Sequence, residues 1–191
     1  MEYDSDIQLM LEFKKGDKIA FQKLFDMYKK RVINYCYRFC GNPFVAEDLA
    51  QETFIRVYKA GPRYDPKSRF STWLFKIATN VCLNELRKPV YKNKIASLDD
   101  AEQVEQVELR DNGNTGADEN IEGQEMQKMI MEAVQSLPEN QRVALLLRVD
   151  QDFSYKEIGK QIKCNENHVK ILIHRARKKL TDLIKQKKRI P

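Results

Sequence analysis

The sequence predicts an all-helical protein of two small domains joined by an acidic linker. Apolar residues recur at the three-to-four-residue spacing of a buried helix face through most of the chain. Only 7 glycines and 6 prolines occur in 191 residues, which is too few for the frequent turns of a strand-rich fold. The charge is also divided into blocks, because residues 91–125 are acidic whereas the segments on either side are basic.

Composition excludes several classes of protein. No run of roughly 18 apolar residues is present, so no membrane-spanning helix is expected. Residues 1–6 are acidic and lack the basic and then apolar layout of a secretory signal peptide. The four cysteines form no CxxC pair, so we expect a cytoplasmic protein without a disulfide framework. No Gly-rich phosphate loop or nucleophile elbow occurs, so we expect neither an enzyme nor a cofactor.

The net charge of +6 indicates a polyanionic partner. Basic domains commonly bind nucleic acid, whose phosphates attract lysine and arginine. A second interpretation is that lysine-rich helices only keep the protein in solution. The choice between the two depends on where the cations lie on the folded chain.

Three helices are expected in the first part of the chain. A short helix over 6–14 ends before Gly16, and Asp17 suits the N-cap of a longer second helix. The tripeptide Gly-Asn-Pro at 41–43 ends that second helix, and a third follows over 44–60. The buried face of the second helix is expected to comprise Ala20, Phe21, Leu24, Phe25, Tyr28, Val32, Tyr35, Cys36 and Phe39.

The third helix has two different sides. Its apolar side, which we expect to be buried, consists of Ala46, Leu49, Ala50, Thr53 and Val57. Its opposite side consists of Asp48, Gln51, Glu52 and Ile55. The favoured interpretation of this second side is an acidic face that is solvated or binds a partner.

A basic loop and a fourth helix complete the first domain. The loop over 63–69 contains Arg63, Tyr64, Lys67 and Arg69. The helix over 71–88 is ended by Pro89 and is expected to bury Trp73, Leu74, Ile77, Ala78 and Val81, with Phe70 and Phe75 also packing. Its exposed edge consists of Lys76, Asn80, Leu83 and Arg87. Tyr64 is the aromatic residue best placed to stack on a base, because Trp73 falls on the core face of its helix.

Residues 91–123 change in composition. They are acidic and poor in large apolar residues, so we expect a linker that is disordered unless a partner orders it. From 124 a helix is expected to bury Met126, Met129, Ile130, Ala133, Val134 and Leu137. Pro138 suits the first position of the next helix, which runs to about 149.

The strongest local signal follows. Ser154 and Glu157 are spaced for a capping box, and Phe153 with Ile158 for a hydrophobic staple. The helix that begins here is short, and after a brief turn Asn165 can cap a second helix. This order of elements is that of a helix-turn-helix.

The second of these helices has an apolar side and a basic side. At about 100° per residue the core side consists of Val169, Leu172, Ile173, Ala176, Leu180 and Leu183. The outer side consists of Asn167, Lys170, Ile171, His174, Arg175 and Lys178. An outward isoleucine among cations suits the major groove, where bases offer acceptors and thymine offers a methyl group. The alternative is an ordinary amphipathic hairpin of helices.

No metal site is expected. Cys164, His168 and His174 supply three zinc ligands without a fourth, and they lie on two faces of the helix. Asp48 and Glu52 are one turn apart, so they offer a possible Mg²⁺ pair for a nucleic-acid-processing enzyme. We favour a solvated or partner-binding role for these two carboxylates.

Taken together, the chain resembles an extracytoplasmic-function sigma factor of the sigma-70 family, an initiation subunit of bacterial RNA polymerase. Three blocks carry the resemblance, in the order and at the spacing of that family. They are AEDLAQETF at 46–54, FSTWLFKIATN at 70–80, and the helix-turn-helix with YKEIG at 155–159 and HRARKKL at 174–180.

The resemblance implies sigma domain 2 at 1–90, an acidic linker at 91–123 and sigma domain 4 at 124–191. Core polymerase would be contacted through its β′ clamp helices and its β flap. The residues implied to face the β′ clamp helices are Asp48, Gln51, Glu52 and Ile55. Those implied to capture the −10 promoter element are Arg63, Tyr64, Lys67, Arg69, Lys76, Asn80 and Arg87. An amide such as Asn80 offers a donor and an acceptor to the edge of an unpaired base.

The resemblance also implies a −35 reader in the second domain. Its contact residues would be Arg148, Asn167, His168, Lys170, Ile171, His174, Arg175 and Lys178. This sequence departs from the family there, because Lys163 replaces a common turn glycine, Asn167-His168 a common Gly-Thr and Ile171-Leu172 a common Ser-Arg. A helix-turn-helix is still expected with these changes, but the base sequence of the −35 element is not predicted.

Function follows from the resemblance as an expectation. The protein would bind core polymerase, recognise a two-part promoter and help open the duplex, with an anti-sigma factor as a possible partner. The acidic linker would either imitate nucleic acid in the RNA path of polymerase or serve as a tether. The principal rival is a stand-alone helix-turn-helix regulator, which leaves the Asp48–Glu52 face and the Asn80 edge without a role.

Overall fold

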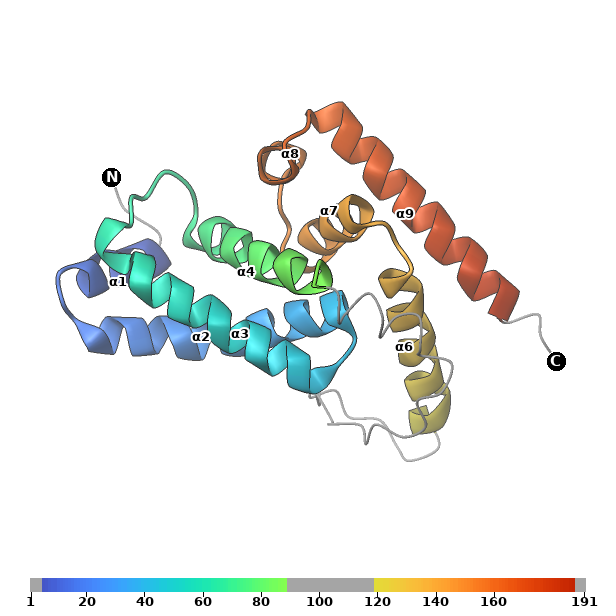
Figure 1. Ribbon diagram of the computed structural model, residues 1–191, viewed down its shortest axis with the longest axis horizontal. Coiled ribbons are helices and arrows are strands. Elements are labelled where there is room, and N and C mark those ends of the chain that lie inside the picture. The colour runs from blue at the N-terminus through green and yellow to red at the C-terminus, as the bar shows by residue number, and fades with distance from the viewer. Residues whose placement is uncertain (1–4, 89–118, 188–191) are drawn as a thin grey trace.

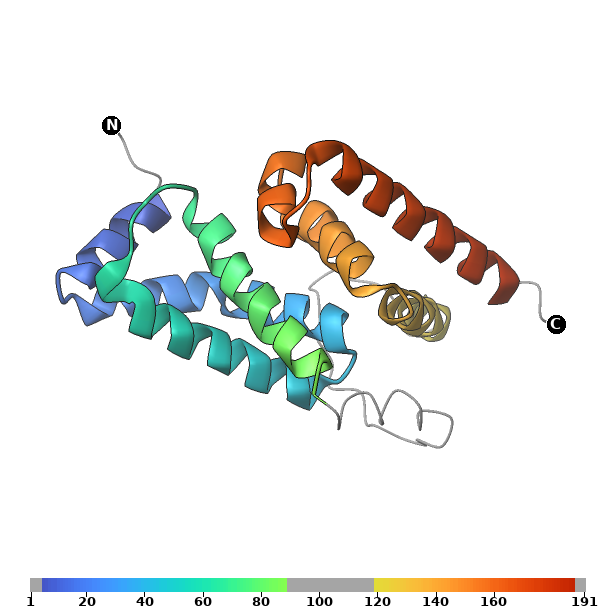
Figure 2. The ribbon, with the colours of Figure 1, turned by 45° about the horizontal axis from the view of Figure 1, so that its top comes forward.

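The computed structural model describes residues 5–88 and 119–187, and every regular element in these ranges is helical. The first group comprises α1 (Ser5–Lys14), α2 (Lys18–Cys40), α3 (Pro43–Ala60), the short 3₁₀ helix η1 (Gly61–Arg63) and α4 (Phe70–Leu86). The second comprises α6 (Glu119–Gln135), α7 (Glu139–Asp150), α8 (Tyr155–Ile162) and α9 (Glu166–Lys187). Figures 1 and 2 show the two groups side by side. The predicted all-helical fold is confirmed, while residues 91–118 of the expected linker lie outside the described residues.

The first boundaries follow from the caps that the sequence predicts. Asp17 accepts a hydrogen bond from the amide of Ile19 at 2.8 Å, so it is the N-cap of α2. α2 ends at Gly41, whose φ of +76° is a left-handed conformation that glycine adopts without strain. The side chain of Asn42 then accepts from the amide of Val45 at 3.1 Å and begins α3.

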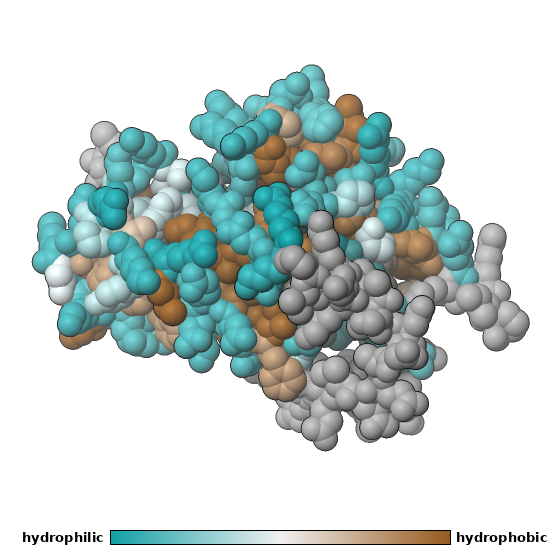
Figure 3. All heavy atoms as spheres, viewed as in Figure 1, coloured by the Kyte–Doolittle hydropathy of each residue, from teal (hydrophilic) through white to brown (hydrophobic). Residues whose placement is uncertain are grey.

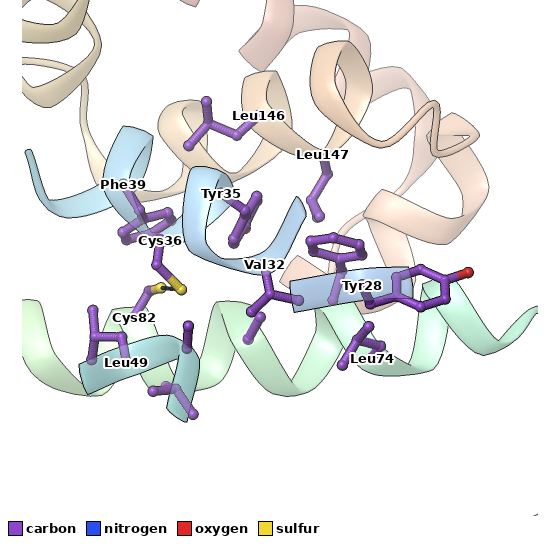
Figure 4. Close-up of a cluster of buried hydrophobic side chains, with 14 of the residues drawn as sticks. Tyr28, Val32, Tyr35, Cys36, Phe39, Leu49, Leu74, Cys82, Leu146 and Leu147 are labelled. Carbon is purple, nitrogen blue, oxygen red and sulfur yellow. Dashed lines mark hydrogen bonds between the residues drawn. The ribbon is translucent and has the colours of Figure 1, made fainter. Parts of the chain in front are cut away.

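The core of the first group lies between α2, α3 and α4. α2 buries the predicted face except for Phe21 and Phe25, which are half-buried, and α3 buries all five predicted residues. Figure 4 shows Val32 and Tyr35 of α2 among Leu49 of α3 and Leu74 and Cys82 of α4. α4 ends at Leu86, two residues before its expected end. Phe70 and Phe75 are buried as predicted, and Trp73 is half-buried.

The helices of the second group begin close to where they are expected. α6 begins at Glu119, five residues before the helix was expected to start. Its backbone hydrogen bonds continue the helix beyond the residues whose side chains are buried. Ala133, Val134 and Leu137 are buried, but Ile130 is 42% exposed, so the predicted burial of Ile130 is wrong. Figure 1 shows the reason for this exposure: the N-terminal end of α6 projects away from α7, α8 and α9.

The helix-turn-helix forms as predicted. The hydroxyl oxygen of Ser154 accepts from the amide of Glu157 at 3.2 Å, and the carboxylate of Glu157 accepts from the amide of Ser154 at 2.9 Å. α8 ends at Lys163, which has a left-handed φ of 57° and ψ of 48°. Asn165 then accepts from the amide of His168 at 2.8 Å and begins α9.

α7 lies at the centre of the whole molecule. Six consecutive residues of α7, from Arg142 to Leu147, are buried, which requires neighbours on every side of the helix. α8 and α9 cover one side, and α2 and α4 of the first group cover the other. The two predicted domains therefore share one continuous apolar core in this structure.

Candidate nucleic-acid interface

The outer side of α3 is a mixed acidic and apolar face. Asp48 and Gln51 are exposed, Ile55 is 41% exposed, and Glu52 is half-buried with its carboxylate 2.7 Å from the Nε of Arg56. These four residues share one side of the helix, as predicted. Sequence reasoning missed two further residues of that side, Phe44 and Tyr58, which are 63% and 43% exposed.

A sequence signal for the two missed residues exists. Phe44 and Tyr58 continue the spacing of the polar side at intervals of three and four residues. Large apolar side chains held in water next to charges are typical of surfaces that bind another protein. We name the set Phe44, Asp48, Gln51, Glu52, Ile55 and Tyr58 the α3 face. Figure 3 shows hydrophobic surface lying between hydrophilic side chains on the side of the molecule seen in Figure 1.

The basic loop between η1 and α4 presents its cations to solvent. Arg63, Lys67 and Arg69 are all exposed, as expected. The ammonium of Lys67 lies 2.9 Å from the carboxylate of Asp65, and hydrogen bonding to that carboxylate raises the pKa of Lys67. Both side chains of this pair are well exposed, so solvent screens the interaction.

The expected exposure of Tyr64 is wrong, because its side chain is only 1% exposed. The ring packs edge-on against Trp73, with 4.9 Å between centroids, and Lys14 donates to the Tyr64 carbonyl at 2.8 Å. Burial raises the pKa of Tyr64 to about 12. A loop position does not imply exposure when aromatic side chains at the start of the next helix offer a pocket. Tyr64 is therefore not available to stack on a base.

The edge of α4 is exposed as predicted. Lys76, Asn80 and Arg87 are exposed, and Leu83 between them is half-buried. The guanidinium of Arg87 lies 3.1 Å from the carboxylate of Glu139 at the start of α7. The basic loop and the edge of α4 thus form one surface with donors and acceptors, and Arg87 at its far end contacts the second group of helices.

The outer side of α9 is a basic stripe. Every residue of α9 that was expected to contact the −35 element is exposed, namely Asn167, His168, Lys170, Ile171, His174, Arg175 and Lys178. On the opposite side Val169, Leu172, Ile173 and Ala176 are buried. Ile171 is 46% exposed among these cations, as the helical spacing predicts.

Arg148 of α7 lies beside this stripe, because its guanidinium and the ammonium of Lys170 both lie over the ring of Tyr155. It is half-buried, and its guanidinium donates to the carbonyl of Phe153 at 3.0 Å and lies 5.2 Å from the ring centre of Tyr155. These contacts hold the turn between α7 and α8. In this structure these contacts of Arg148 support the helix-turn-helix.

Within residues 5–88 and 119–187, no three His, Cys, Asp or Glu side chains come together as a possible metal site. None of the helices in those ranges is both long enough and apolar enough to cross a membrane.

Comparison with known proteins identifies the family of the chain. The family model for sigma-70 region 2 matches residues 24–89, and that for sigma-70 region 4 matches residues 127–180. The chain is 33% identical over 173 residues to the ECF RNA polymerase sigma factor SigW of Bacillus subtilis, a match that covers 88% of this chain and 91% of SigW. It is 32% identical over 188 residues to the RNA polymerase sigma-H factor of Pseudomonas aeruginosa, covering 91% of each.

Solved structures agree on the fold. CnrH, solved in complex with the cytosolic domain of CnrY, has a TM-score of 0.67 at 19% identity over 96% of this chain and 99% of its own. The sigma factor RpoE of Bartonella quintana, solved with the anti-sigma factor NepR, has a TM-score of 0.64 at 22% identity over 86% of this chain and 96% of its own. The chain therefore belongs to the extracytoplasmic-function (ECF) sigma factors, the alternative initiation subunits that bind core RNA polymerase and recognise promoter DNA.

Proposed function

We propose that the two groups of helices divide promoter recognition between them. Residues 1–90 act as sigma domain 2, residues 124–191 as sigma domain 4, and residues 91–123 as the linker. The observation that carries this assignment is the pair of separate basic surfaces, one on the loop and edge of α4 and the other on α9. Two readers on one chain fit a promoter with two elements.

The α3 face is proposed to dock on the β′ clamp helices of polymerase. It combines exposed carboxylates with exposed apolar side chains, which is the composition of a surface that binds specifically in a polar surrounding. The Asp48→Arg, Glu52→Arg double variant should lose core binding and remain folded. The Glu12→Arg, Asp26→Arg variant is the matched control, because it makes the same charge change at exposed positions on α1 and α2.

The outcome of that comparison is decided by co-elution with core polymerase. Loss of co-elution for the α3 variant alone supports the assignment. Equal binding by both variants and the unsubstituted chain would show that polymerase docks elsewhere.

The −10 element is proposed to bind the loop and edge of α4. Arg63, Lys67, Arg69, Lys76 and Arg87 attract phosphates, and Asn80 reads the pairing edge of an unpaired base. A single-stranded base offers this edge only after the duplex has opened. This half of the protein would therefore help open the promoter by binding the opened strand.

The −35 element is proposed to bind α9 through the major groove. Arg175 and Lys170 can donate to guanine, and Ile171 can contact the methyl group of thymine. Asn167, His168, His174 and Lys178 complete the exposed stripe. Arg148 would make a further contact beside this stripe, since its guanidinium shares the ring of Tyr155 with Lys170.

We also propose that the chain catalyses no reaction of its own, needs no cofactor and works in the cytoplasm. Core polymerase supplies the chemistry of transcription, and a sigma factor supplies recognition. The two solved structures described above hold CnrY and the anti-sigma factor NepR. By analogy with these complexes, an anti-sigma factor is proposed as a regulatory partner for this chain.

Run-off transcription tests the function as a whole. Core polymerase is incubated with a pool of genomic fragments, with and without this protein. New discrete transcripts that share two upstream elements, and that require core, are the expected result. Binding of duplex DNA by the protein alone, without new transcripts, would instead favour a stand-alone helix-turn-helix regulator.

A further inference from the structure

The chain contains two histidines, His168 and His174, and both lie in α9, the helix proposed to read the −35 element. Both side chains are exposed. Histidine is the side chain that ordinarily changes its charge between pH 5 and 8, whereas lysine and arginine stay charged throughout that range. The charge of the surface proposed to bind DNA therefore depends on pH at these two positions.

His174 lies in the middle of the basic stripe. Lys170 is one turn before it and Lys178 one turn after it, so the three side chains share one side of the helix. Arg175, the next residue in the chain, is also exposed. A polyanion that lies along these cations therefore also meets the imidazole of His174.

Three other helices, α6, α7 and α8, pack against α9. Beside the stripe, α7 places the guanidinium of Arg148 and α8 the ring of Tyr155, which both lie next to Lys170. Toward α6, the ammonium of Lys179 donates to the carbonyl of Ser136. In the part of the chain that the structure describes, no carboxylate forms an ion pair with either imidazole. The surroundings of His174 are therefore cationic or neutral.

His168 lies in the first turn of α9, about 120° around the helix from His174. Its backbone amide donates to the side chain of Asn165 at 2.8 Å. Burial raises the pKa of the neighbouring Cys164 thiol, so this thiol stays neutral below pH 8. The charged side chains at this end of α9 line one surface hollow, and they are Lys156, Lys160, Lys163 and Glu166. Because His168 is offset from the stripe and close in sequence to a carboxylate, we expect it to contribute less than His174.

DNA offers these imidazoles the acceptors that the protein lacks. Phosphate oxygens carry negative charge, and guanine presents two acceptors in the major groove. A neutral imidazole has one N–H donor, whereas an imidazolium ion has two donors and a positive charge. An opposite charge within about 4–6 Å favours the charged form by about tenfold or more. Contact with DNA therefore favours the imidazolium ion.

We propose that His174, with a smaller contribution from His168, binds the −35 element as an imidazolium ion, so that promoter binding takes up protons. This inference rests on the proposed function and adds its dependence on pH. A complex that holds more protons than its separate components becomes tighter as the pH falls and weaker as the pH rises. Recognition of the −35 element therefore strengthens on acidification.

The affinity of the chain with core polymerase for a promoter found by run-off transcription is measured between pH 6 and pH 8. Ionic strength is held constant, because phosphate contacts depend on salt. The double variant His168→Gln, His174→Gln is the reference at each pH, so the pH dependence of polymerase itself cancels in the ratio. With a tenfold preference for the charged form, the relative affinity should rise about sixfold from pH 8 to pH 6 for each fully coupled imidazole.

Single variants divide this rise between the two histidines. Both side chains are exposed, so glutamine should leave the fold intact. His174→Gln should remove most of the rise and His168→Gln a smaller part. His174→Lys stays charged, so it should bind tightly at pH 8 and gain little on acidification. Lys178→Gln is the control, because loss of a permanent charge should weaken binding at every pH and leave the rise unchanged.

Calorimetry of the full chain with the same promoter duplex counts the protons directly. Titrations at pH 7 in two buffers of different ionisation enthalpy should show an uptake of about half a proton for each fully coupled imidazole. The double glutamine variant should take up none through these positions. Uptake therefore separates protonation of the histidines from a change of shape or salt dependence.

The outcomes distinguish this inference from the function beneath it. The same pH dependence in the unsubstituted chain and the double variant would overturn proton uptake by the histidines and leave the sigma function intact. A larger loss of the rise in His168→Gln than in His174→Gln would overturn the leading role of His174. If the chain with core polymerase formed no specific promoter complex at any pH, the proposed function would fail and the inference with it.

Discussion

Replacing Lys163 with glycine should stabilise the helix-turn-helix. Lys163 ends α8 with a φ of 57° and ψ of 48°, a left-handed conformation in which the Cβ of an L residue crowds the following carbonyl. That crowding costs about 1–2 kcal/mol, and glycine avoids it. Glycine also loses more conformational entropy on folding, which offsets about 0.5–1 kcal/mol. The net gain should be about 0.5–1 kcal/mol.

A matched control lies one turn earlier in the same helix. Lys160 is exposed and has helical backbone geometry, so Lys160→Gly should cost about 1 kcal/mol. The two variants have the same composition and net charge. The two variants should therefore differ in free energy of unfolding by about 1.5–2 kcal/mol. Most effects of the substitutions on the unfolded state cancel in this difference, so it measures the cost of the left-handed conformation at Lys163.

Thermal unfolding followed by circular dichroism measures the effect. A change of 1 kcal/mol shifts the Tm of a chain of this size by roughly 2–4 °C, so Lys163→Gly should melt higher and Lys160→Gly lower. Hydrogen exchange adds a local readout, because the amide of Cys164 donates to the carbonyl of Gly159 at 2.9 Å across this turn. If Lys163→Gly melted at or below the unsubstituted protein, the strain argument would be refuted.

Three further predictions concern other parts of the chain. Arg142→Met should lower the free energy of unfolding by about 3–5 kcal/mol, because it leaves the carbonyls of Phe39 and Leu137 without their charged donor; a loss below about 1 kcal/mol in urea unfolding would contradict this. Arg175→Ala should weaken binding of promoter DNA by about 1–3 kcal/mol if Arg175 makes a bidentate base contact. Titration against duplexes with altered −35 sequences checks it, since an equal loss on every sequence would identify a phosphate contact instead. Asn80→Ala should impair promoter opening more than closed-complex binding, and normal permanganate reactivity of the opened bases would argue against that role.

Several site surfaces could be predicted because they depend on one helix at a time. The side of α3 that carries Asp48 and Gln51 and the side of α9 that carries Lys170 and Arg175 both face solvent as expected. An amphipathic helix has only one way to bury its apolar side, so helical spacing alone selects the residues that remain outside. The exposed set follows from that choice, whereas the roles of its members stay predictions.

Other residues could not be placed in this way. Tyr64 was expected in solvent but is buried, and the hydrogen bond from Arg148 to the carbonyl of Phe153 was not predicted. Arg142 had no predicted role, although it is among the most buried charged residues that the structure describes. The position of each of these side chains depends on contacts with residues of another element. The pattern of residues within one helix or loop does not predict such contacts.

The sequence by itself determined the helices, their caps and their faces. Asp17, Asn42 and Ser154 each satisfy amides two or three residues away, and helical spacing is equally local, so these features follow from short stretches of chain. Only the tertiary structure decided that the two domains share a core and that Arg142 joins them. Contacts such as Arg38–Asp150 and Thr72–Glu157 arise when surfaces far apart in sequence meet, and their formation depends on the shape and charge of both surfaces together.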